Sequence, residues 1–154
     1  MQVSEILRVK GSTLYTVGPE TMLSDAVITM ADNDIGSVVV MDKGALLGLV
    51  TFREVMRVIA DRQAEGKHGR TPPVEEIRVG DVMNASPSLA GPTMDVNELR
   101  RSMIDSHQRY IPVMDGATLL GVISFHDVAR AVLEEQTFEN KMLKAYIRDW
   151  PAEG

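Results

Sequence analysis

Two short segments of the chain place a hydroxyl, a phenylalanine, a basic side chain and an acid in the same order. Residues 51–54 read TFRE and residues 124–127 read SFHD. A hydroxyl at a helix start can meet a phosphate together with nearby backbone N–H groups. A carboxylate three residues later can accept two hydrogen bonds from a ribose 2′,3′-diol, and such charge-assisted bonds are worth about 1.5–3 kcal/mol. The segments therefore predict sites for a ribose and a phosphate.

The same residues also have a purely structural interpretation. Ser124 and Thr51 stand where a side chain caps a helix, and Asp127 and Glu54 stand where an acid favours the helix dipole. The two acids differ by one methylene, which displaces the Glu54 carboxylate by about 1.5 Å. That displacement is enough to spoil a bidentate contact with a diol. We therefore expect Asp127 to carry the working site, and Thr51 with Glu54 to form a possible degenerate second site.

Catalysis is not expected. Ser124, His126 and Asp127 have the types of a catalytic triad, but neighbours on a helix point about 100° apart and cannot converge. The sequence contains no Walker loop and no cysteine, and its other histidines, His68 and His107, lack metal-ligand spacing. We predict a protein that is not an enzyme and requires no metal.

Charge and hydropathy narrow the range of partners. The formal net charge of −6 argues against general binding of nucleic acid, which rests on clustered Lys and Arg. The sequence has no long apolar span, which predicts no membrane partner. Residues 1–10 lack the basic start and apolar run of a signal peptide, so a cytoplasmic location is expected.

The two segments belong to a duplicated unit. Gly48 and Gly121 lie 73 residues apart, and this offset holds without a gap from Pro19 and Pro92 onward. Each copy is short for an independent domain, so the copies are expected to pack together. The predicted divisions are a first motif, a linker rich in Gly, Pro and charge, a second motif and a C-terminal tail helix, at residues 1–62, 63–77, 78–135 and 136–154.

The hydrophobic periodicity predicts the element order β-α-β-β-α in each copy. In the first copy we expect a helical turn, an extended segment, a helix, two strands and a helix at 3–9, 14–17, 21–33, 35–41, 45–50 and 52–60. The corresponding elements of the second copy are 79–83, 87–89, 96–106, 110–114, 118–123 and 126–135. Residues 134–148 continue as a helix whose apolar stripe should cover a surface on its own lobe or on a partner chain.

The two apolar strand segments, IGSVVVMD at 35–42 and YIPVMD at 110–115, together with the repeated corners, resemble the paired CBS-domain proteins, whose two motifs form a Bateman module. The resemblance covers about residues 1–135, and the tail looks like that of stand-alone bacterial members. It implies an α/β fold of tandem motifs packed pseudo-symmetrically through their sheets. It also implies a homodimer that binds an adenine nucleotide and regulates an unidentified target protein.

The resemblance implies AMP first among the ligands, with ADP, ATP, NAD(H) or S-adenosylmethionine as further candidates. It places a basic residue facing phosphate at Arg109, which could equally be a solvated surface arginine. His126 would assist an anionic phosphate. Candidate adenine neighbours, or simply core residues, are Ile111, Pro112 and Val113; the first copy's half of the site would be lined by Thr16, Gly36 and Ser37. The alternative function is a structural dimerisation adaptor whose clefts are empty or filled by its own side chains.

Overall fold

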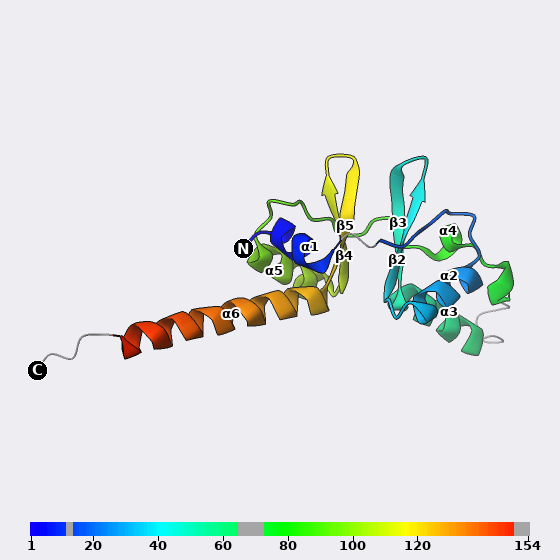
Figure 1. The fold of residues 1–154 in the computed structure, drawn as a ribbon. Helices are drawn as coiled ribbons and strands as arrows, with labels where there is room; N and C mark the ends of the chain where they lie inside the picture. Colours follow the sequence, from blue (N-terminus) through cyan, green and yellow to red (C-terminus); the bar gives the residue numbers. More distant parts are fainter. Residues whose placement is uncertain (12–13, 65–72, 150–154) are drawn as a thin grey trace, which may run out of the picture.

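The computed structural model describes residues 1–11, 14–64 and 73–149. The chain forms two lobes that lie side by side, each with a β-hairpin packed against helices (Figure 1). A mixed α/β fold built from two copies of one motif was predicted from the sequence, and the structure confirms it.

The first lobe has a three-stranded sheet in the order β1-β2-β3. Strand β1 pairs with β2 in parallel, and β2 pairs with β3 in an antiparallel hairpin. The hairpin turn contains Lys43 and Gly44, which both have positive φ, as tight hairpin turns require. The elements of this lobe are β1 (Thr16–Val17), α2 (Leu23–Asp32), β2 (Ser37–Asp42), β3 (Ala45–Thr51) and α3 (Phe52–Gln63).

The second lobe repeats the hairpin but has a shorter sheet. It contains α5 (Val96–Ser106), β4 (Tyr110–Asp115), β5 (Thr118–Ser124) and α6 (Phe125–Arg148). The extended segment expected at 87–89 does not form a strand, and its place is taken by a single parallel bridge between Ala90 and Val113. Pro87 and Pro92 flank this bridge, and proline has no N–H to extend a ladder.

The N-terminal helix of each copy packs against the lobe of the other copy. Helix α1 (Val3–Lys10) buries Val3 in the core of the second lobe, whereas α4 (Val79–Val82), which follows the short 3-10 helix η1 (Val74–Glu76), buries Val79 in the core of the first. The backbone contacts are equivalent: Val3 N donates to Met94 O at 2.9 Å, and Val79 N donates to Thr21 O at 2.8 Å. This exchange brings the end of α1 to the first turn of α6.

The two lobes meet through their sheets. Along β2, Val38 and Val40 join the helix-covered core of the first lobe, while Val39 points to the opposite face. Successive residues of a strand alternate between the faces of its sheet, which accounts for this division. Val39 packs with Leu49 of β3 and Val122 of β5 in a small core between the hairpins. The predicted packing through the sheets is thus confirmed.

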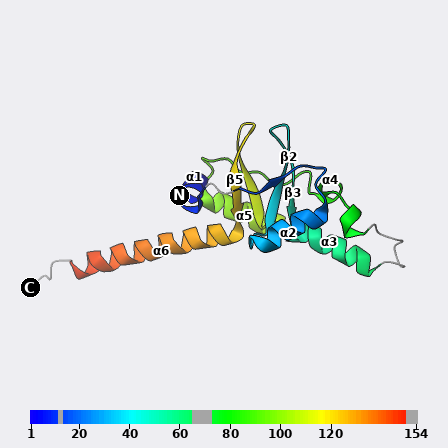
Figure 2. The ribbon, with the colours of Figure 1, turned by 45° about the vertical axis from the view of Figure 1, so that its right-hand side comes forward.

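Helix α6 continues without a break from the predicted second-motif helix into the predicted tail and ends at Arg148; residues 150–154 of that tail lie outside the described residues. Its first turns pack on the second lobe, where Val128 is buried, and its later turns run past the lobe into solvent (Figures 1 and 2). The apolar stripe of the tail is therefore largely uncovered within one chain. In the described part of the chain, no helix combines the length and apolarity needed to cross a membrane.

Candidate functional site

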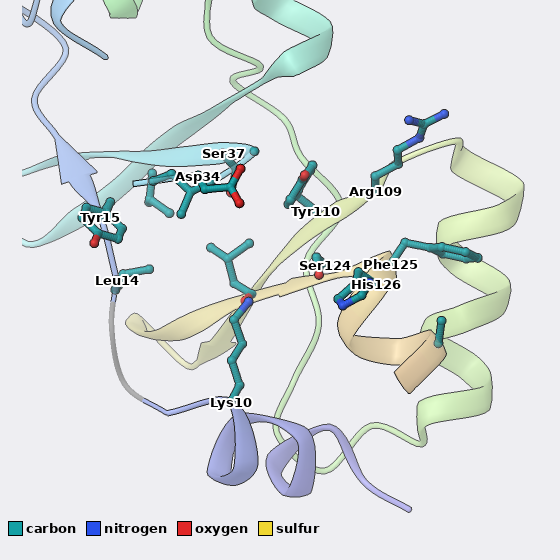
Figure 3. A pocket seen from close by; sticks show the side chains of 15 residues that line it. Lys10, Leu14, Tyr15, Asp34, Ser37, Arg109, Tyr110, Ser124, Phe125 and His126 are labelled. Carbon is teal, nitrogen blue, oxygen red and sulfur yellow. The ribbon is translucent and has the colours of Figure 1, made fainter. Parts of the chain in front are cut away.

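A cleft of about 820 Å³ lies between the lobes at the start of α6, and we call it the α6 cleft. It receives residues from α1, from both hairpins and from the first turns of α6 (Figure 3). Its lining comprises Lys10, Leu14, Tyr15, Asp34, Ile35, Gly36, Ser37, Val39, Arg109, Tyr110, Val122, Ser124, Phe125, His126 and Ala129. Five of the predicted site residues therefore meet in one cavity, namely Gly36, Ser37, Arg109, Ser124 and His126.

Ser124 caps α6 and lines the cleft at the same time. Its Oγ accepts from the backbone N–H of Asp127 at 3.0 Å, and its own N–H donates to Asp127 Oδ2 at 2.9 Å. This reciprocal pair is a capping box, which satisfies two backbone donors at the helix start. Ser124 and Asp127 therefore do cap the helix, as the structural interpretation of the SFHD segment predicted. The Ser124 side chain also borders the cavity.

Asp127 is paired with a lysine and does not belong to the cleft lining. Lys10 Nζ lies 2.6 Å from Asp127 Oδ2 and 2.6 Å from the backbone oxygen of Val122, so α1 brings a cation directly to the acid. Burial tends to raise the pKa of Asp127, but hydrogen bonds from Lys10 and Ser124, with the charge of Lys10, outweigh burial. The pKa of this carboxyl therefore lies below its usual value.

The remaining predicted residues lie elsewhere. Ile111 and Val113 are fully buried in the core of the second lobe, and Pro112 between them is also buried. Thr16 is exposed on β1 and lines neither of the clefts described here. Since Ile111 and Val113 point to the helix-covered face of β4, the aromatic neighbour available to a ligand from this strand is Tyr110.

Tyr110 packs in a tight contact with the first lobe. Its ring meets Phe52 edge-on, with centroids 6.4 Å apart, and a Cβ built on Gly36 would fall 1.7 Å from its hydroxyl oxygen. Position 36 therefore requires glycine because a neighbouring ring occupies the space. Burial raises the pKa of Tyr110, with Arg109 acting in the opposite direction and Asp127 adding to the rise.

A second cleft, of about 540 Å³, lies at the start of α3, and we call it the α3 cleft. Thr51 and Glu54 line it, facing His107 and Gln108 from the second lobe. Its full lining is Leu49, Thr51, Phe52, Arg53, Glu54, Met56, Asn84, Ser106, His107, Gln108, Arg109 and Tyr110. The two clefts are related by the repeat offset, and Arg109 and Tyr110 border both.

Sequence reasoning missed several residues of the α6 cleft. Lys10 could not be placed because the repeat does not reveal that α1 crosses to the other lobe. Asp34 had a recoverable signal, since it matches His107 at the 73-residue offset, and both adopt positive φ. Tyr15, Tyr110 and Phe125 form part of the wall, but periodicity alone marks such aromatic residues as core.

The α6 cleft has the chemistry of a site for a flat ring joined to an anion. Lys10, Arg109 and His126 supply basic groups, and Asp34 is the single acid of the lining. In Figure 3 the Arg109 guanidinium points away from Ser124, so it lies at the rim of the cleft. Among the described residues, no three acids or histidines gather in a group able to hold a metal.

The sequence matches the CBS domain family over residues 3–61 and 79–134, and the chain belongs to this family as a pair of CBS domains. The predicted resemblance is confirmed. CBS domain-containing protein CBSX3, mitochondrial, of Arabidopsis thaliana is 31% identical over 95% of this chain and 71% of that protein. Paired CBS domains are generally non-catalytic regulatory modules.

Two solved structures illustrate the likeness. The CBS-domain containing protein ATU1752 from Agrobacterium tumefaciens is 28% identical, with a TM-score of 0.74 over 85% of this chain and 98% of that chain. The structure of CBSX2 in complex with AMP has a TM-score of 0.69 and 22% identity, over 88% of this chain and 98% of that chain. At this identity the second comparison shows the common fold.

Proposed function

We propose that this protein is a non-catalytic regulatory module that binds an adenine nucleotide in the α6 cleft and acts on a target protein. The observation that carries the proposal is the meeting, in one cavity of about 820 Å³, of aromatic walls with Lys10, Arg109 and the capped start of α6. That volume falls within the roughly 300–1,000 Å³ of small-molecule sites. The AMP complex of the similarly folded CBSX2 supports the choice of ligand class.

The ligand would bridge both lobes. The adenine would lie against Tyr15 or Phe125, and the phosphate would lie near Ser124, His126 and the basic rim. AMP is the first candidate and ADP, ATP and NAD(H) are further ones, because each carries phosphate for the basic groups, whereas S-adenosylmethionine has none. Asp127 would accept hydrogen bonds from the ribose hydroxyls only after its ion pair with Lys10 is broken.

Regulation follows from the position of the cleft. Tyr15, Asp34 and Ser37 belong to the first lobe, and Ser124 and His126 to the second. A nucleotide that contacts both lobes favours the arrangement that completes its contacts, so occupancy changes the surface offered to the target protein. We place the protein in the cytoplasm and expect it to act as a homodimer.

A purely structural adaptor is the second candidate, and one contact favours it. Lys10 Nζ already lies 2.6 Å from Asp127 Oδ2. Such pairing is expected where the polar side chains bind one another and no ligand is needed. Native mass spectrometry of freshly purified protein separates the two functions. A retained adenine nucleotide is expected for the regulatory module. If no nucleotide is retained, and none binds when nucleotide is added at increasing concentrations, the adaptor is favoured.

Calorimetry with a matched pair of variants locates the site. Ala129 lines the α6 cleft where the repeat places Met56 in the α3 cleft. Ala129→Met should fill the α6 cleft and weaken AMP binding at least tenfold, whereas Met56→Ala should leave the affinity unchanged. A panel of AMP, ADP, ATP, NADH and GMP on the parent protein then ranks the ligands. Binding that survives Ala129→Met but responds to Met56→Ala would move the site to the α3 cleft.

A further inference from the structure

Lys10 stands between the α6 cleft and the carboxylate of Asp127. Besides the cleft, Lys10 lines a groove of about 600 Å³ between α1 and α6. Asp127 lines this groove but not the cleft. In Figure 3 the Lys10 side chain extends from the end of α1 to the strand that carries Val122. A ligand in the cleft therefore meets the lysine before it reaches the acid.

The ammonium of Lys10 is held at two points. Its Nζ lies 2.6 Å from Asp127 Oδ2 and 2.6 Å from the backbone oxygen of Val122. An ammonium has three N–H donors, so these contacts within the described residues leave one donor for a ligand. The side chain of Lys10 is 33% exposed and that of Asp127 is 18% exposed. An ion pair that water reaches in this way contributes little to stability, so another anion can replace the carboxylate.

Adenosine and AMP would act differently on this ion pair. The ribose hydroxyls are neutral donors, so adenosine reaches the Asp127 carboxylate only by leaving the ammonium of Lys10 without an anion. AMP carries a phosphate that can accept from the ammonium, and such charge-assisted bonds are stronger than neutral ones. With AMP one ion pair is therefore replaced by another, whereas with adenosine it is lost.

The other charged groups of the cleft lining leave this exchange to Lys10. The Arg109 guanidinium lies at the rim and points away from Ser124 (Figure 3). The ring of His126 contacts Arg130, with Nε2 and Nη2 3.3 Å apart. Asp34 is an acid from the first lobe, and it repels a phosphate. The anion is therefore favoured on the side of the second lobe, where α1 packs and Lys10 lies.

We propose that Lys10 is a specificity-determining residue that selects phosphorylated nucleosides for the α6 cleft. In the ligand-free protein its ammonium holds Asp127. A 5′-phosphate takes over the ammonium and releases the carboxylate for the ribose hydroxyls, while the backbone oxygen of Val122 remains a partner of Lys10. The α3 cleft lacks this device, because there the equivalent oxygen of Leu49 accepts from the backbone N–H of Asn84.

This inference rests on the proposed function, and calorimetry with AMP and adenosine on Lys10→Met tests it. Methionine keeps most of the stem and removes the charge. Adenosine affinity should rise about two- to fivefold, the size expected for a partly exposed ion pair that no longer has to be broken. AMP affinity should change less than about twofold, because the lost phosphate contact offsets the released carboxylate. The sign of the change for adenosine is decisive, since damage to the cleft would weaken both ligands.

Three matched variants complete the experiment. Lys10→Arg retains the charge and should keep the parent's preference for AMP. Arg8→Met removes a cation from the same helix that lines the groove but not the cleft, so both affinities should stay unchanged. In an Asp127→Asn protein the ion pair is already absent, so adding Lys10→Met should no longer raise adenosine affinity.

The outcomes separate this inference from the proposed function. A parent protein that binds neither AMP nor adenosine would refute the proposed function and the inference with it. A parent that binds AMP, with a ratio of AMP to adenosine affinity that Lys10→Met leaves unchanged, would refute the role of Lys10 alone. A fall in adenosine affinity in Lys10→Met would likewise overturn it.

Discussion

The two helix starts that bear the repeated motif are built alike but differ in what reaches the acid. At α3, Glu54 Oε1 accepts from the backbone N–H of Thr51 at 2.8 Å and from its hydroxyl at 2.9 Å, so both donors are neutral. At α6, Asp127 accepts from the Ser124 N–H and from the ammonium of Lys10. Duplication has kept the helix cap, while helix α1 brings a lysine to one corner, where it forms an ion pair with the acid.

The origin of this difference lies at the end of α1 and just after α4. Leu49 and Val122 are equivalent in the repeat. The backbone oxygen of Leu49 accepts from the N–H of Asn84 at 2.9 Å, whereas that of Val122 accepts from Lys10 Nζ. One sheet edge is thus closed by a peptide group and the other by a charged side chain. The same backbone oxygen therefore accepts from a backbone N–H in one copy and from a lysine ammonium in the other.

The largest expected effect separates the two acids in ligand binding. Asp127→Ala should weaken AMP binding about 10- to 150-fold, which corresponds to about 1.5–3 kcal/mol, because a charged acceptor for ribose is lost. Glu54→Ala should change the affinity little. Calorimetry on both variants measures this, with Glu54→Ala as the matched control and Lys10→Ala measured beside them. If Lys10→Ala alone reproduces the whole loss of affinity, Asp127 acts through the lysine. Equal losses for Asp127→Ala and Glu54→Ala would show that the two acids do not differ in ligand binding.

Glycine at position 36 should matter to stability because the Tyr110 ring occupies the space beside it, although the equivalent position of the other copy holds Arg109. Gly36→Ala should cost about 1–3 kcal/mol in the free energy of unfolding, since the added methyl group overlaps the Tyr110 ring. The matched control is Gly18→Ala, where a Cβ meets its nearest atom at 4.0 Å. Urea denaturation compares the two, and a Gly36→Ala protein as stable as the Gly18→Ala protein would contradict the close contact.

The sequence predicted the fold well because the repeat and the periodicity act locally. The strand at 110–115 and the cap at Ser124 follow from patterns within a few residues. The site was predicted less completely, because its lining depends on which copy each segment packs against. Lys10 lies 117 positions from Asp127, and no local pattern joins them. For Ile111 and Val113 the sequence left two interpretations, adenine neighbours or core residues, because residue type alone does not show which face of β4 meets the cleft.

Arg109 borders both clefts, so its role in phosphate binding can be separated from a general role in shaping them. Arg109→Ala should weaken AMP binding about tenfold, or about 1.4 kcal/mol, and adenosine binding much less, because only AMP offers a phosphate for a charge-assisted contact. Arg53→Ala, at the α3 cleft, should leave both affinities unchanged. Equal losses of AMP and adenosine affinity in Arg109→Ala would show that the arginine shapes the pocket and does not bind the phosphate.

The smallest expected effect is a difference in how pH acts on the two corners. The folded-state pKa of Asp127 is lowered, so the stability it contributes is present above the unfolded pKa of about 3.9 and is lost as pH falls through the folded value. Asp127→Asn should therefore be less stable than the parent at pH 7, by about 0.5–1 kcal/mol, because the ion pair is partly exposed and screened.

This gap should begin to close as the pH falls below about 4 and should close as the pH passes through the lowered folded-state pKa, where the parent carboxyl gains its proton and resembles the amide. Glu54→Gln is the matched control, because the donors to Glu54 are neutral and its amide oxygen can still accept from them. Urea denaturation of the three proteins at pH 7, 5 and 3 measures both gaps. A gap for Asp127→Asn that stays constant across this range would show that the amide disturbs packing, and that the Lys10 charge does not stabilise the corner.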